Sequence, residues 1–230
     1  MFRSLATTVC LAIAAVVLAV ATAEAAPVSP VYIYGNLGTV NASTTSNSVG
    51  YLNPSQPNQF QAQGFSVGNQ VGSSSWDIQE IQLGLGSSGS PSPVVSIYSD
   101  GEVPVSPLAT FTGTTSVSTK GLYTFTGSFT ALQNTTYWVV LSNANSASLE
   151  SYEWFTNDAF TTPTQQNASN VNYAGTLERN GVAGSWTTAI PSLSIGINAV
   201  AVPEPPTYAL AMVAGVLGAG AAARRRAKKA

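Results

Sequence analysis

Two glutamates and two aromatic residues lie close together near residue 152 of the chain. Glu150 and Glu153 flank Tyr152, and Trp154 follows directly. Two carboxylates can hydrolyse a glycosidic bond when they face each other across about 5 to 9.5 Å. On an extended chain, however, residues three apart point to opposite faces of the strand, which disfavours a shared catalytic site. We therefore predict no enzyme and no catalytic residue.

The same segment could bind carbohydrate without cleaving it. The chain has four tryptophans, Trp76, Trp138, Trp154 and Trp186. A ring that stacks on a sugar must lie on the surface, whereas a core tryptophan does not. Core packing is the expectation for each of them, with Trp154 and Trp186 the best candidates for exposure. If the chain has a sugar site, we expect it to use Trp154, Tyr152 and Trp186.

Several other chemistries are excluded by composition or weakly supported by pattern. Histidine is absent, and the only cysteine, Cys10, lies in an apolar N-terminal run, which excludes catalytic triads, thiol nucleophiles, the usual zinc sites and a disulfide framework. Oxygen ligands occur at 100–102 and 157–158, but no loop has the regular calcium-loop pattern, so we predict no metal and no cofactor. Thr124 and Thr126 could be read as part of a flat threonine array of the kind that binds ice, but one such pair is ordinary strand composition.

The N-terminal segment has the pattern of a secretory signal peptide. Arg3 precedes an apolar stretch of 13 residues from Val9 to Ala21, and small residues suitable for cleavage follow near Ala23. The stretch is shorter than the roughly 20 residues that span a bilayer. Residues 1–26 are therefore predicted to form a signal helix that is removed on export.

The C-terminal segment has three parts in a fixed order. Proline-rich residues begin at 202, an apolar run covers 207–223, and basic residues occupy 224–229. The prolines fix φ and lack N–H groups, so we expect the proline-rich segment to be extended and unpaired. The 17-residue run would be about 26 Å long as a helix, enough to cross the hydrocarbon core when flanking arginines snorkel. The basic residues are expected to stay cytoplasmic and to stop transfer. They are Arg224, Arg225, Arg226, Lys228 and Lys229.

This tail resembles the PEP-CTERM sorting signal of Gram-negative bacteria. The resemblance rests on Pro203, Glu204 and Pro205, then the short apolar run, then the arginine cluster, and it covers about residues 203–230. It implies that an exosortase recognises and processes the tail. It also implies export to the envelope, attachment to the membrane through the tail, and later placement at the cell surface or in an extracellular matrix. A plain tail anchor that is never processed is the alternative.

The segment between the two ends, residues 27–201, has the composition of one acidic domain. It contains two basic residues against eight acidic ones, which gives a formal net charge of −6. Nucleic-acid binding needs clustered lysines and arginines and is therefore excluded for this domain. Its length is ordinary for a single domain with its own core.

Hydrophobic residues in this domain recur at every second position, as in half-buried strands. The parity changes once near Gln79 or Glu80 and again across Gly64, which predicts two β-bulges or bends. Asn180-Gly181 is the best hairpin turn. We predict an all-β domain, an antiparallel β-sandwich resembling a jelly roll. Its expected core residues are Phe65, Val67, Ile81, Leu83, Val95, Ile97, Phe125, Tyr137, Val139, Leu141, Leu193, Ile195 and Ile197.

Short motifs at 64–67, 95–100 and 135–141 make the domain similar to the choice-of-anchor R type of bacterial surface domain. That resemblance implies a surface role without an established catalytic activity. We therefore expect a secreted structural or adhesive protein of the envelope or exopolysaccharide layer. The alternative is a carbohydrate-binding module that uses exposed aromatic residues.

Overall fold

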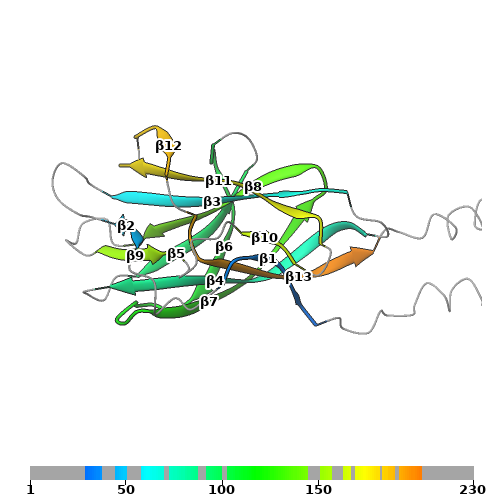
Figure 1. Cartoon of the computed structure of the whole chain (residues 1–230), viewed down its shortest axis with the longest axis horizontal. Helices are drawn as coiled ribbons and strands as arrows, with labels where there is room; N and C mark the ends of the chain where they lie inside the picture. Colours follow the sequence, from blue (N-terminus) through cyan, green and yellow to red (C-terminus); the bar gives the residue numbers. More distant parts are fainter. Residues whose placement is uncertain are drawn as a thin grey trace, which may run out of the picture.

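The computed structural model describes residues 29–37, 45–50, 58–69, 73–87, 92–99, 103–144, 151–156, 163–166, 169–181, 183–189 and 192–203. Within these ranges the chain forms strands and no helix, which confirms the all-β prediction (Figure 1). The strands are β1 (Val31–Gly35), β2 (Ser46–Gly50), β3 (Gln59–Val67), β4 (Ser73–Ser87), β5 (Pro93–Tyr98), β6 (Pro107–Gly113), β7 (Gly121–Leu132), β8 (Thr135–Asn143), β9 (Ser151–Phe155), β10 (Thr164–Gln165), β11 (Val171–Asn180), β12 (Trp186–Thr188) and β13 (Ile195–Pro203).

Eight of these strands form a closed antiparallel barrel. The hydrogen-bonded order runs β4, β7, β6, β5, β8, β3, β2 and β9, and β9 pairs with β4 again. The predicted sandwich is therefore corrected, because β2 and β9 bridge the two edges that a sandwich would leave open. Closure leaves none of these eight strands as an open edge, and the ends of the sheet are the short strands β10 and β12 outside the barrel. The antiparallel arrangement itself was predicted.

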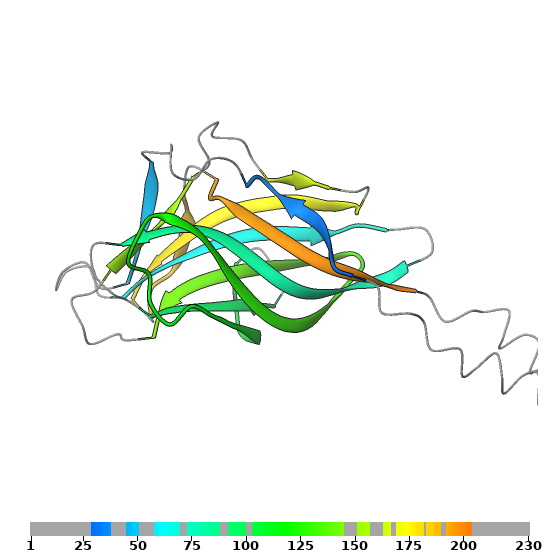
Figure 2. The same cartoon turned by 90° about the horizontal axis from the view of Figure 1, so that it is seen from below.

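The remaining strands extend two of the barrel strands. β13 pairs with β4, β1 pairs with β13, and β10 pairs with β1. Next to β3, β11 pairs with β3 and β12 pairs with β11. β1 and β13 lie side by side, with Val31 opposite Ala199 (Figure 2). The first described strand therefore begins beside the middle of the last described strand.

The end of β13 corrects a sequence expectation. The proline-rich segment was expected to be unpaired, with the domain ending at residue 201, yet β13 includes Val202 and Pro203. Pro203 lies opposite Ser73, just beyond an irregularity in the register. Proline lacks an N–H, so the last position of a strand beside a register shift is where it fits.

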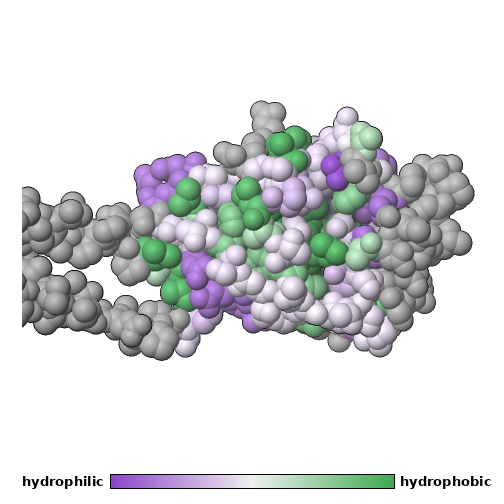
Figure 3. Space-filling view, turned by 180° about the vertical axis from the view of Figure 1, so that it is seen from behind, coloured by the Kyte–Doolittle hydropathy of each residue, from purple (hydrophilic) through white to green (hydrophobic). Residues whose placement is uncertain are grey.

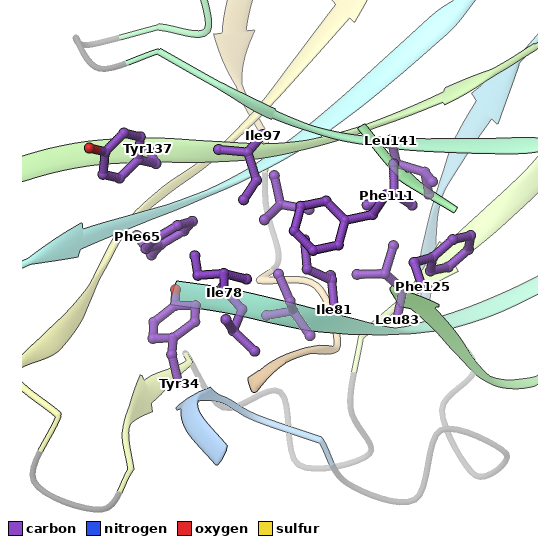
Figure 4. Packing of buried hydrophobic residues seen from close by; sticks show 14 of the residues in the cluster. Tyr34, Phe65, Ile78, Ile81, Leu83, Ile97, Phe111, Phe125, Tyr137 and Leu141 are labelled. Carbon is purple, nitrogen blue, oxygen red and sulfur yellow. The ribbon is translucent and has the colours of Figure 1, made fainter. Parts of the chain in front are cut away.

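The barrel interior is filled by one hydrophobic core (Figure 4). All the residues that the sequence predicts for the core are buried, with at most 4% of any side chain exposed. Tyr34 joins them, and its hydroxyl donates to the carbonyl oxygen of Gly64 at 3.0 Å. Burial raises the pKa of the Tyr34 phenol well above its usual range, so the group stays protonated and keeps this hydrogen bond.

One predicted bulge is confirmed and the other is relocated. Glu80 and Ile78 lie opposite consecutive residues of β13, so Gln79 is the extra residue on β4. β3, by contrast, keeps an unbroken register with β8 through Gly64, and the irregularity lies on β11 between Tyr173 and Gly175. The parity change in β3 arises because both faces of this strand are covered.

A second, smaller cluster covers the outer face of β3. Ala62 packs there with Trp138, Val140 and Leu177, and Phe60 lies at its border. Tyr137 to Leu141 is consequently buried on both faces, as the lack of alternation predicts.

The predicted signal peptide (1–26), transmembrane helix (207–223) and basic cluster (224–229) lie outside the described residues. Within the part of the chain that the structure describes, no helix has the length and apolar character needed to span a membrane. The predicted hairpin at Asn180-Gly181 is present between β11 and β12, although Arg179 pairs with Trp186 and the connection is longer than two residues.

Candidate functional site

The outer surface of β6 and β7 carries a row of exposed hydroxyl groups. Along β7 the side chains alternate strictly, with Phe125 and Ala131 buried in the barrel and every second residue exposed. β6 contributes two more threonines beside them. We call this set the hydroxyl face: Thr110, Thr112, Thr124, Thr126, Ser128 and Thr130.

Register between the strands holds these hydroxyls in place. Thr112 lies directly opposite Thr126, and each side-chain hydroxyl donates to the other residue's carbonyl oxygen at 3.3 Å. The hydroxyl of Thr110 lies 3.0 Å from that of Ser96 on β5. Neighbouring hydroxyls therefore have fixed positions on a strand scaffold. Thr112 and Thr126 donate their only proton within the protein, so these two hydroxyls face solvent as acceptors.

Carboxylates and amides of β4 border the hydroxyl face. Ser128 donates to Oδ1 of Asp77 at 3.0 Å, and Gln79 donates to Oδ2 of the same carboxylate at 3.1 Å. Glu80 Oε1 accepts from the amides of Gln82 and Asn198 at 2.8 and 2.6 Å. The face thus presents donors and acceptors of the kind that pair with sugar hydroxyls.

The tryptophan predicted as the main sugar platform is a core residue. Trp154 is fully buried, and its indole N–H donates to the carbonyl oxygen of Ser194 at 2.8 Å. It cannot stack on a ligand at the surface, so this part of the predicted sugar site is wrong. Tyr152 lies on β9 opposite Val49, and its side chain falls outside what the structure describes. Trp76 and Trp138 are buried, as expected.

Trp186 keeps part of its surface exposed but already has partners. The Arg179 guanidinium lies 4.7 Å from its ring centroid and 4.3 Å from that of Phe60. The indole N–H of Trp186 donates to the carbonyl oxygen of Pro104 at 3.0 Å. Desolvation lowers the pKa of Arg179, but the guanidinium remains charged at neutral pH. Trp186 therefore packs against the outer cluster of β3. It is distant in sequence from Trp154.

The acidic residues considered for catalysis or metal binding are only partly described. Glu153 is exposed on β9, whereas Glu150 and the oxygen ligands at 100–102 and 157–158 lie outside the described residues. Among the residues that the structure describes, no three His, Cys, Asp or Glu side chains gather as metal ligands would.

The sorting-motif residues are likewise divided. Pro203 ends β13, while Glu204, Pro205 and the basic residues after 223 lie beyond the described ranges.

Most of the hydroxyl face was missed at the sequence level. Thr124 and Thr126 were noticed as a pair, but Ser128 and Thr130 continue the same alternation. A serine or threonine at every second position over seven residues was the available signal. The contribution of β6 depends on the pairing of Thr112 with Thr126, which no local pattern reveals.

Figure 3 shows a surface of weak polarity, on which strongly hydrophobic and strongly hydrophilic residues are scattered. Comparison with models of protein families, with curated proteins and with solved structures found no match to this chain.

Proposed function

We propose that the chain is an exported, non-enzymatic surface protein whose barrel contacts extracellular polysaccharide through the hydroxyl face. The observation that carries the proposal is the exposed, register-fixed row of hydroxyls on β6 and β7. Polysaccharide chains offer hydroxyls at regular intervals, and each can both donate and accept a hydrogen bond. A rigid row of protein hydroxyls can therefore make many weak contacts along one chain.

The sequence supports the placement of this barrel at the cell envelope. Residues 1–26 have the pattern of a signal peptide, and 202–230 resemble a PEP-CTERM sorting tail whose processing enzyme would be an exosortase. The similarity of residues 60–141 to choice-of-anchor R domains agrees with a structural or adhesive role. Attachment to the membrane through residues 207–223 would come first, and transfer to the exopolysaccharide layer would follow.

The polysaccharide contact can be tested with variants that remove hydroxyls and keep shape. Thr126→Val and Thr130→Val together delete two hydroxyls while retaining β-branched side chains suited to a strand. We expect the double variant to migrate faster than the unchanged domain in native gels that contain exopolysaccharide from the producing strain. Thr188→Val on β12 is a matched control, because it is exposed but lies away from the hydroxyl face.

The same gels separate the alternative based on aromatic residues. If Trp186→Ala abolished retardation and the double threonine variant did not, the ligand would stack on the outer cluster of β3. If neither the unchanged domain nor any variant were retarded in the gels, the proposal of a polysaccharide contact would fail and a purely structural role would remain.

A further inference from the structure

Very little chain separates the barrel from the predicted transmembrane helix. β13 continues through Pro203, and the apolar run begins at Thr207. The three residues between them reach at most about 11 Å when fully extended. The headgroup layer is itself roughly 5 to 8 Å thick on each side of the hydrocarbon core. A barrel attached in this way has no free linker that would let it stand away from the membrane.

The barrel end nearest the tail is defined by strand register. Pro203 lies opposite Ser73, and Ser75 lies opposite Leu132 at the end of β7. Val67, at the end of β3, lies opposite both Thr135 and Val171. We call this surface the tail end; β1 begins farther from it, because Val31 lies opposite Ala199 at the middle of β13.

The tail end carries an exposed aliphatic side chain. Leu132 is 56% exposed at this end, and Val31, which lies farther along the barrel, is 41% exposed. Hydrophobic residues are visible at this end of the molecule in Figure 3. In water such side chains gain nothing from exposure, whereas at a bilayer interface they bury apolar surface.

The tail end carries few charges among the described residues, and the nearest is Asp77, which lies opposite Thr130, two positions before Leu132. Lys120, Glu153, Glu178 and Arg179 lie toward the opposite end, because their strand positions pair with the far ends of β4 and β3. The described residues of the connections at this end, Asn69, Gln133, Asn134, Ser169 and Asn170, carry no charge.

Side-chain amides occupy the tail end instead. Asn134 donates to the side-chain oxygen of Asn69 at 3.0 Å, and Asn170 donates to the backbone oxygen of Asn69. An acidic domain would be repelled by anionic lipids through its carboxylates, and the described carboxylate nearest this end, Asp77, accepts hydrogen bonds from Ser128 and Gln79.

From these observations we infer that the tail end rests on the lipid headgroup layer, with Leu132 in the interface. The inference rests on the proposed membrane-spanning role of residues 207–223. The long axis of the barrel is then roughly perpendicular to the membrane. The hydroxyl face runs along β7 and therefore faces the extracellular layer beside the barrel. The bilayer surface is therefore a second contact of the domain, in addition to the helix that anchors it.

Two leucines of β7 provide a matched test. Leu122 and Leu132 are 50% and 56% exposed and lie at opposite ends of the same strand. Their ten-residue separation corresponds to about 33 Å along a strand. Each is changed to cysteine, as Leu122→Cys or Leu132→Cys, in the chain of residues 27–230, which lacks the predicted signal helix and has no other cysteine. A fluorophore is attached to the new cysteine. The labelled proteins are reconstituted into vesicles of phosphatidylethanolamine and phosphatidylglycerol that contain a headgroup-spin-labelled lipid, which quenches a nearby fluorophore.

We expect the fluorophore at position 132 to be quenched several-fold more than the one at position 122. Equal quenching at both positions would mean that the barrel lies on its side, and quenching at neither would mean that it stands clear of the lipid. Either result overturns the inference while leaving the anchor intact, provided that the protein floats with the vesicles. Failure to float would instead refute the membrane-spanning tail, and the inference with it.

Discussion

Trp154 shows how a single residue can be misjudged from its neighbours. Tyrosine and glutamate beside a tryptophan are typical of a sugar site, but here the ring closes the barrel. Trp154 lies opposite Asn47 on β2 and Leu85 on β4, where β9 joins the two halves. Its N–H is satisfied by Ser194, so the indole is both packed and hydrogen-bonded. Its role in this structure is to stabilise the closure.

We therefore expect substitutions of Trp154 to change stability and leave polysaccharide binding unaltered. Trp154→Ala should lower the free energy of unfolding by about 3 to 5 kcal/mol, because a large buried ring is deleted. Trp154→Phe should cost less, since it keeps an aromatic ring and loses the hydrogen bond to Ser194. Urea denaturation of the mature domain measures both changes, with Trp186→Ala as the half-buried comparison.

The outcome that contradicts this assignment is specific. If Trp154→Phe unfolded at the same urea concentration as the unchanged domain but lost retardation in polysaccharide gels, Trp154 would be a ligand contact. Trp154→Phe is the informative variant for this purpose, because Trp154→Ala could fail to fold and so give no binding measurement.

Among the elements, β13 is the strand whose extent bears most on function. It lies between β1 and β4 and ends at the first residue of the Pro-Glu-Pro motif. Its last residues pair with Trp76, Ser75 and Ser73 of β4. A domain boundary drawn at residue 201 would cut through this pairing.

A chain that ends after Pro203 should therefore be more stable than one that ends after Val200. The shorter chain loses the pairing of Ala201 and Val202 with β4, and each net hydrogen bond contributes roughly 0.5 to 1.5 kcal/mol. We expect a loss of about 1 to 3 kcal/mol in total. Thermal unfolding of the two mature chains decides the point, and equal melting temperatures would mean that residues 201–203 contribute nothing to the fold.

The same strands show how far the sequence alone could lead. The inward residues of β4, β8 and β13 follow from alternation, and the bulge at Gln79 follows from its interruption. Barrel closure does not follow, because β2 has the unremarkable sequence Ser-Asn-Ser-Val-Gly and pairs with β9, about a hundred residues later. Alternation reports which face of a strand is buried but not which strand lies beside it, and this limit also concealed the two threonines that β6 adds to the hydroxyl face.

At the scale of the whole molecule, we expect the barrel to fold independently of the tail that follows Pro203. The described strands bury a hydrophobic core of their own. We expect deletion of 204–230 to release a folded barrel into the periplasm or medium, with an unchanged melting temperature. Neutral substitutions at Arg224, Arg225 and Arg226 should weaken the stop across the membrane, because positive residues hold the cytoplasmic side. Fractionation of cells into membrane, periplasm and medium measures both effects.

Changes within the sorting motif should act on processing and leave insertion intact. Pro203 belongs to β13, so altering it risks the strand, whereas Glu204→Ala with Pro205→Ala changes only residues beyond the last strand. In a host that carries an exosortase, this double variant should accumulate in the membrane as the unprocessed form. Its insertion should be normal, because the apolar run and the basic cluster supply the membrane signal. If mature size and location were unaltered, residues 202–230 would be an ordinary tail anchor, and the barrel would remain at the membrane surface on its short tether.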